Sequence, residues 1–316
     1  MTSRARRLAT FLRVMFPPAF MVPSAIVNVL CIDGALQALA GDATLRYGLR
    51  AALCAALVLL FMLLLRVYDE LKDVETDLRL GRAGDPRYKD RPIVTGAVQE
   101  GDLVLLRNVT LTLLVAAGLA LRDPLATGTV AAALGLCWLS SRWFFYPPIS
   151  RNILLAFVTH NPLSLAISAV VVAAFAGARG PDALGPWTAP LMIGLWAPVA
   201  AWEVSRKLRT PAEETDYQTY SKVLGLRAAA LIPGAFALLS AACLLGVARA
   251  AGLAWPAPAV IGAGAVAVAG AALRLSLAPT PARAAGLRPL VEGFALLANV
   301  GLLAALVHAR GVSWGP

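Results

Sequence analysis

The sequence predicts an all-α integral membrane protein, a bundle of about nine transmembrane helices. Hydrophobic residues make up 59% of the chain and charged residues only 15%, whereas soluble proteins carry about 25% charged residues. The mean hydropathy is +0.72. Apolar stretches long enough to cross a bilayer recur along the whole chain. We expect residues 1–316 to form a single membrane domain.

Each expected span is an apolar segment of about 20 residues. The first span is interrupted by Pro17-Pro18 and Pro23, and the fifth by Asn161-Pro162. Such breaks are tolerated where neighbouring helices satisfy the freed backbone groups. The spans are expected at residues 16–38, 49–68, 103–121, 125–141, 153–177, 187–205, 226–248, 255–276 and 286–308.

The basic residues predict the orientation of the bundle. The N-terminus and the loops after every second span hold 22 of the 28 Lys and Arg residues. Positive residues gather on the cytoplasmic side of membrane proteins, so we expect a cytoplasmic N-terminus, an external C-terminus and a location in a bacterial inner membrane. This topology accounts for the net charge of +10, and we expect membrane lipid around the chain and no nucleic-acid partner.

Two cytoplasmic loops, at about 66–107 and 202–227, hold most of the charged residues. Asp69 and Glu203 are 134 residues apart, and so are Asp73 and Lys207. This spacing suggests two related halves, each with a helix that ends in a charged cap. Two caps that face each other would form one polar chamber at the membrane surface.

The first loop begins with three aspartates at intervals of four, Asp69, Asp73 and Asp77. On a helix such residues lie along one face, about 6 Å apart. Rows of oxygen ligands suit Mg²⁺, which commonly bridges carboxylates to substrate phosphates. The alternative is a solvated charged face at the membrane boundary, with Lys72 and Arg79 as partners.

The aspartate series is followed by Arg91-Pro-Ile and Gly96. Together with nine spans, these motifs resemble the UbiA superfamily of intramembrane prenyltransferases. The resemblance implies a helical bundle, a polyprenyl diphosphate donor, and Mg²⁺ held by Asp69, Asp73 and Asp77. The first two positions of the family motif are commonly Asn and Asp, and here they are Asp69 and Glu70, which keeps oxygen ligands at both.

The second half departs from this family pattern. Glu203 stands at the first acidic position of the expected second motif, but Lys207 takes the next. The basic side chains either hold the diphosphate in place of a metal ion or reflect topology alone. Nearby acids either return a carboxylate to the site or neutralise the cations; they are Glu213, Glu214 and Asp216.

The resemblance assigns roles to the charged and aromatic residues near both motifs. The expected catalytic residues are Asp69, Asp73, Asp77 and Glu203. The residues expected to bind substrate are Arg66, Lys89, Arg91, Tyr146, Arg151, Arg206, Lys207 and Arg209.

The predicted reaction is Mg²⁺-dependent transfer of a prenyl group to a small aromatic or other apolar acceptor. A terpene cyclase, in which the substrate's own double bond captures the cation, is the alternative. A transporter would more often place its ionisable groups at mid-bilayer, whereas here they cluster at one face. His160, inside the fifth span, is interpreted either as a hydrogen-bonded core residue or as a functional one.

Overall fold

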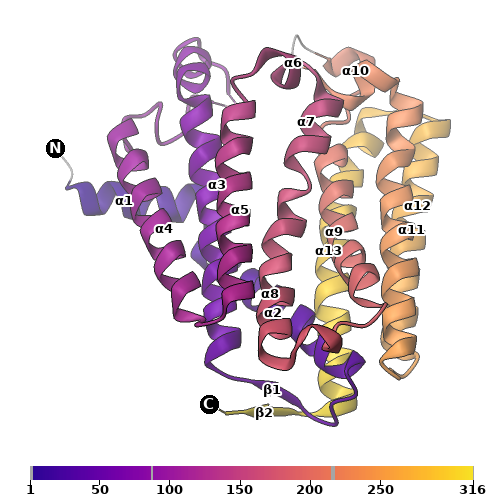
Figure 1. Ribbon diagram of the computed structural model, residues 1–316. Helices are drawn as coiled ribbons and strands as arrows, with labels where there is room; N and C mark the ends of the chain where they lie inside the picture. Colours follow the sequence, from indigo (N-terminus) through magenta and orange to yellow (C-terminus); the bar gives the residue numbers. More distant parts are fainter. Residues whose placement is uncertain (1–2, 87, 215–217, 316) are drawn as a thin grey trace.

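The computed structural model describes residues 3–86, 88–214 and 218–315. Long helices run side by side and form a bundle with loops at both ends (Figure 1). The segments expected from the sequence all appear in order. They are α2 (Pro18–Leu39), α3 (Leu49–Arg82), α4 (Glu100–Ala120), α5 (Pro124–Trp143), α7 (Ile153–His160) with α8 (Leu163–Arg179), α9 (Thr188–Ser205), α11 (Leu226–Ala250), α12 (Pro256–Leu277) and α13 (Pro281–Arg310).

Short elements lie at the ends and the side of the bundle. α1 runs across the bundle helices, α6 and α10 lie at the top in Figure 1, and two strands pair at the bottom. Their bounds are α1 (Arg4–Met15), α6 (Pro147–Ser150), α10 (Tyr220–Leu224), β1 (Leu45–Tyr47) and β2 (Val312–Trp314), with 3-10 turns η1 (Pro181–Ala183) and η2 (Pro211–Glu213).

Eight helices in the described part of the chain are long and apolar enough to cross a membrane. They are α2, α3, α4, α5, α7 with α8, α11, α12 and α13. The ninth expected segment is α9, whose 18 residues include Glu203 close to its C-terminal end. It packs against α11, α13 and α2, so neighbouring helices shield much of it from lipid.

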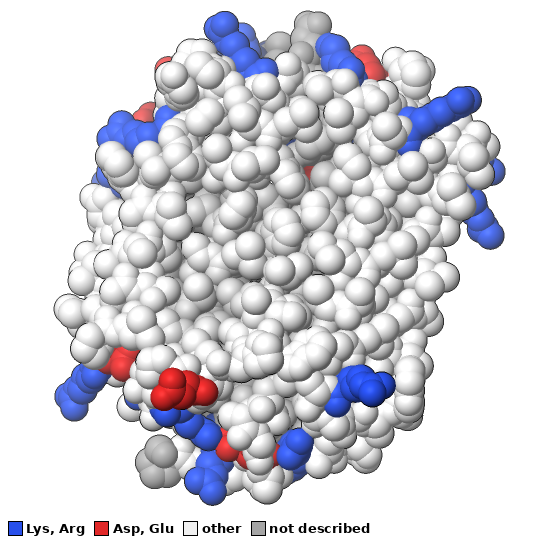
Figure 2. Space-filling view, turned by 45° about the vertical axis from the view of Figure 1, so that its right-hand side comes forward, with Lys and Arg blue, Asp and Glu red and all other residues white. Residues whose placement is uncertain are grey.

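Charged residues on the face drawn in Figure 2 lie mostly toward the two ends of the molecule. A broad band between them carries almost no Lys, Arg, Asp or Glu. Such a band matches the apolar core of a bilayer, about 30 Å thick. The chain is therefore built as a multi-pass integral membrane protein.

Proline has different effects in two of the helices. Pro23 lies inside α2, which continues without a break. Asn161 and Pro162 separate α7 from α8, as the sequence predicts. This break makes His160 the last residue of α7.

Helix α3 extends beyond the apolar core of the membrane, and most of its charged residues lie in the projecting part. Its 34 residues, at 1.5 Å each, span about 51 Å, which exceeds the bilayer core by about 20 Å. The loop 83–99 folds back on the projecting end, where a Cβ on Gly81 would come within 2.5 Å of the Val94 side chain. The absence of a side chain at Gly81 therefore allows the loop to lie close to α3.

Helix α1 is attached to the same end of the bundle. The Arg7 guanidinium donates two hydrogen bonds, of 2.6 and 2.9 Å, to the buried carboxylate of Asp102 on α4. Phe11 packs into an apolar cluster with Val67 and Val74 of α3. These contacts brace the projecting end of α3 together with Val98 of the loop, which belongs to the same cluster.

The distribution of basic residues and the course of the helices lead to a topology prediction. A reporter fused after Lys222 should be on the cytoplasmic side, and one fused after Ser313 on the outside. Activity of paired alkaline phosphatase and fluorescent-protein fusions would measure this. Two reporters on one side would contradict the nine-segment course.

Candidate active site

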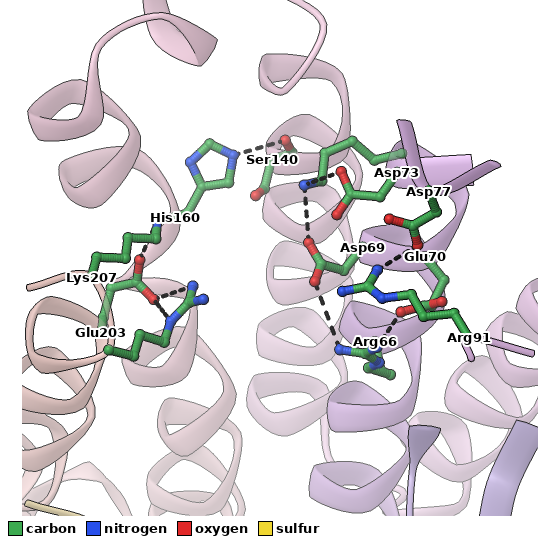
Figure 3. A network of polar contacts seen from close by, with 12 residues as sticks. Arg66, Asp69, Glu70, Asp73, Asp77, Arg91, Ser140, His160, Glu203 and Lys207 are labelled. Carbon is green, nitrogen blue, oxygen red and sulfur yellow. Dashed lines mark hydrogen bonds and ion pairs between the residues drawn. The ribbon is translucent and has the colours of Figure 1, made fainter. Parts of the chain in front are cut away.

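Charged residues form two clusters, one at residues 66–77 of α3 and one at residues 203–207 at the end of α9. Both clusters and the end of α7 lie at the same end of the bundle (Figure 3). Asp69 of α3 lies within electrostatic reach of Arg206 at the end of α9. His160, at the end of α7, is close enough to interact with both Lys72 and Lys207. The two loops that were expected to face each other thus contribute to one polar region.

The outward side of α3 presents two carboxylates around one ammonium group. Nζ of Lys72 lies 3.2 Å from Oδ1 of Asp69 and 2.9 Å from Oδ1 of Asp73. Both carboxylates are partly exposed, with side-chain exposures of 46% and 37%. Since Nζ lies between them, the two like charges are held together by a cation of the protein itself.

The third aspartate of the series does not lie on this face. Asp77 is buried, and its carboxylate pairs with the guanidinium of Arg91 from the loop. Glu70, seven residues earlier on the same side of α3, is also buried and pairs with Arg66. The expectation of three carboxylates along one face is therefore wrong for Asp77, because each four-residue step turns a helix by about 40°.

Arg91 fastens the loop to the helix. Burial disfavours the charged guanidinium, but the hydrogen bond and the charge of Asp77 outweigh this effect, so the pKa of Arg91 is raised. The guanidinium also lies over the ring of Tyr88, 4.8 Å from its centroid. The structure thus gives Arg91 a contact within the protein that the sequence could not indicate.

The cluster at the end of α9 is centred on one carboxylate. Glu203 accepts a hydrogen bond of 2.7 Å from Nε of Arg206 and pairs at 2.8 Å with Nζ of Lys207. Arg206 also lies over the ring of Trp202, 5.0 Å from its centroid. On α13, Glu292 pairs with Arg288 and accepts a hydrogen bond from Trp202.

Two acids in the segment after α9 accept hydrogen bonds from neighbouring residues of the same segment. Glu213 accepts hydrogen bonds from the hydroxyl and the N–H of Thr210, which hold the pKa of Glu213 below its usual value. Glu214 accepts from the hydroxyls of Thr219 and Ser221. Both acids therefore have partners in the loop, and Asp216 lies outside the described residues.

Three residues expected to bind substrate are exposed at the same end of the bundle. They are Lys89 in the loop after α3, and Tyr146 and Arg151 on either side of α6. Arg66 and Arg209 differ from them, because their Nε atoms are buried and have no hydrogen-bond partner among the described residues. These two N–H groups remain available as donors.

Three residues at the site lie outside the expected set of catalytic and substrate-binding residues. Lys72 lies between two acids, Phe144 contacts both Lys72 and His160, and His160 lies between the two clusters. Lys72 has a signal in the sequence, because it directly precedes Asp73 and lies three residues after Asp69. The contacts of Phe144 and His160 depend on how the helices pack.

The carboxylates of the site differ in their fit to Mg²⁺. No group of three or more acidic, His or Cys side chains is arranged to hold a metal within the described ranges. Mg²⁺ usually takes only one or two carboxylates together with substrate phosphates and water. Asp69 and Asp73 fit that requirement, since their oxygens converge on one cation position. Asp77 and Glu203 are occupied by arginine and lysine partners.

The Arg91–Asp77 pair generates a stability prediction. Arg91→Ala leaves a buried carboxylate without its counter-charge and should reduce the free energy of unfolding by about 3 kcal/mol. Thermal unfolding of the purified protein would measure the loss. Lys89→Ala, two residues away and exposed, is the control. Equal melting temperatures for Arg91→Ala and Lys89→Ala would contradict the role of the pair.

The chain is similar to known proteins over most of its length. The model of the UbiA prenyltransferase family matches residues 27–300. No curated protein matches the chain significantly. A solved structure described as digeranylgeranylglyceryl phosphate synthase in membranes is similar in fold, with a TM-score of 0.65 at 11% identity, over 96% of this chain and 99% of that one. The family match covers most of the sequence, and the chain belongs to the UbiA prenyltransferase family.

Proposed function

We propose that this prenyltransferase uses Mg²⁺ to transfer the prenyl group of a prenyl diphosphate to an aromatic or other apolar acceptor at the membrane. The observation that carries the proposal is the position of Lys72, whose ammonium group lies between Asp69 and Asp73. A protein cation there marks a position where a metal ion can be bound by the same two oxygens. Asp69 and Asp73 would hold Mg²⁺, which would neutralise charge on the leaving diphosphate.

The basic residues of both clusters supply the remaining contacts to diphosphate. Lys72, released from the two aspartates, remains near them and can donate to a phosphate oxygen. Arg206 and Lys207 face the α3 cluster from α9. The buried Nε groups of Arg66 and Arg209 add donors that make no hydrogen bond within the described residues. Arginine and lysine are well suited to bind phosphate.

Aromatic rings near the cations support the second part of the reaction. Cleavage of an allylic diphosphate leaves positive charge on the prenyl carbon, and aromatic faces attract such charge. Phe144 and Trp202 already have cationic side chains over their rings. The surrounding helices are apolar and limit the access of water, which would otherwise capture the carbocation.

The identity of the acceptor is best tested with a panel of different molecules. An apolar aromatic molecule can reach the site from the membrane. The similar solved structure is that of a digeranylgeranylglyceryl phosphate synthase, so a panel of acceptors should also include glycerol phosphate ethers. Release of pyrophosphate that depends on one class of acceptor would identify it.

The first functional prediction concerns the metal. Asp73→Asn removes a ligand charge and should lower kcat by about a hundredfold or more while the fold is retained. Pyrophosphate release at a series of Mg²⁺ concentrations would measure it. Glu75→Gln is the matched control, because Glu75 is an exposed acid two residues further along α3. Full activity of Asp73→Asn, or activity that survives EDTA, would refute the metal site.

The second prediction concerns the basic cluster. Lys207→Ala removes a charge-assisted contact and should raise KM for the donor or lower kcat by roughly ten- to a hundredfold. Lys207→Asp should be worse than alanine, because a carboxylate repels diphosphate. Arg227→Ala, an exposed cation at the same end, is the control. If Lys207→Asp were instead active with a steeper Mg²⁺ dependence, the position would be a second metal site.

A further inference from the structure

His160 occupies a position that the proposed reaction has not yet used. It ends α7 at the break before Pro162, and its ring lies between the charged clusters of α3 and α9 (Figure 3). It interacts electrostatically with Lys72 on one side and Lys207 on the other. A diphosphate bound by both lysines would therefore lie beside this ring.

The hydrogen bonds of the ring favour its protonated form. Nδ1 lies 2.8 Å from the carbonyl oxygen of Ala156, and Nε2 lies 3.2 Å from that of Ser140. Carbonyl oxygens only accept, and a neutral imidazole has a single N–H. The hydroxyl of Thr159 is 2.8 Å from Nδ1 but already donates to the carbonyl of Leu155 at 2.7 Å. Only the imidazolium donates to both carbonyl groups.

Two further features also favour a positive charge on this ring. The ring stacks on Phe144, with 3.9 Å between the ring centroids, and aromatic faces attract cations. His160 is the C-terminal residue of α7, and the C-terminal end of a helix carries partial negative charge. An imidazole titrates near pH 6.5 when unperturbed, so modest effects decide its charge at neutral pH.

Burial of the ring opposes protonation, and so do the charges of Lys72 on α3 and Lys207 at the end of α9. The end of α5 contributes Trp143, Phe144 and the carbonyl group of Ser140 to the surroundings of the ring. Each lysine is already paired with carboxylates, Lys72 with Asp69 and Asp73, and Lys207 with Glu203. A further anion beside the ring is therefore needed to favour the extra proton.

We propose that His160 takes up a proton from solvent when diphosphate binds and then acts as a third cation beside Lys72 and Lys207. The incoming anion supplies the negative charge that the extra proton requires, and the two ring N–H groups then both have acceptors. This inference rests on the proposed function, since it requires diphosphate to bind between the clusters. It predicts that donor binding weakens as the pH rises, because free His160 must be protonated on binding.

Calorimetric titration with pyrophosphate and Mg²⁺ tests the proton uptake directly. Titrations at pH 7 in buffers with different ionisation enthalpies give the number of protons exchanged. Wild-type protein without a histidine tag should take up about half a proton to one proton more than His160→Gln. Protons that Mg²⁺ displaces from pyrophosphate cancel in this difference. His308→Gln is the matched control, because His308 is exposed near the C-terminus and the chain has only two histidines.

The possible outcomes separate this inference from the proposed function. Equal proton uptake by wild type and His160→Gln would overturn the role of His160 and leave the diphosphate site intact. Failure of wild-type protein to bind pyrophosphate would overturn the proposed function itself. If His160→Gln did not fold, nuclear magnetic resonance of ring-labelled wild-type histidines would decide. The His160 signal should move to the imidazolium position with pyrophosphate, and no movement would overturn the inference.

Discussion

The structure of the candidate site depends on the pairing of charges at the end of an apolar bundle. Within residues 69–77 of α3, two carboxylates are buried and two are partly exposed, and each has a lysine or arginine partner. An unpaired charge at a buried position would be expensive, and removing one partner of a buried pair typically costs about 3–5 kcal/mol. Pairing therefore allows the charged part of α3 to be partly buried. The pair of Asp77 with Arg91 also holds the loop 83–99 against α3.

The need to pair buried charges also explains why lysine and arginine side chains lie beside the carboxylates of the site. Before diphosphate arrives, Asp69 and Asp73 share Lys72, and Glu203 binds Arg206 and Lys207. On our account, a magnesium diphosphate would replace these internal partners: Asp69 and Asp73 would hold the metal, and the basic residues would bind phosphate. The exchange would leave both aspartates and the basic residues with partners of opposite charge, which limits the cost of binding charge in a largely apolar protein.

Much of the fold could be predicted from the sequence, because long apolar segments and alternating basic loops each have one simple interpretation. The break before Pro162 was also predictable, because it depends on the local sequence. The placement of Asp77 was not, because its partner Arg91 lies 14 residues away in an irregular loop. Likewise, only the packing of α5, α7 and α9 brings His160 near Phe144 and Lys207. The role of Glu203 and the relationship of the two halves stay predictions.

The central claim is that the two clusters form one site for Mg²⁺-dependent transfer from a prenyl diphosphate. The most direct measurement supplies purified protein with prenyl diphosphates of several lengths, with and without Mg²⁺ and acceptors, and identifies the products by mass spectrometry. Our account predicts a prenylated acceptor and released pyrophosphate, both lost when Mg²⁺ is removed. A cyclic hydrocarbon or alcohol formed without acceptor would contradict the transferase assignment and identify a cyclase, and no turnover of any donor would contradict the site.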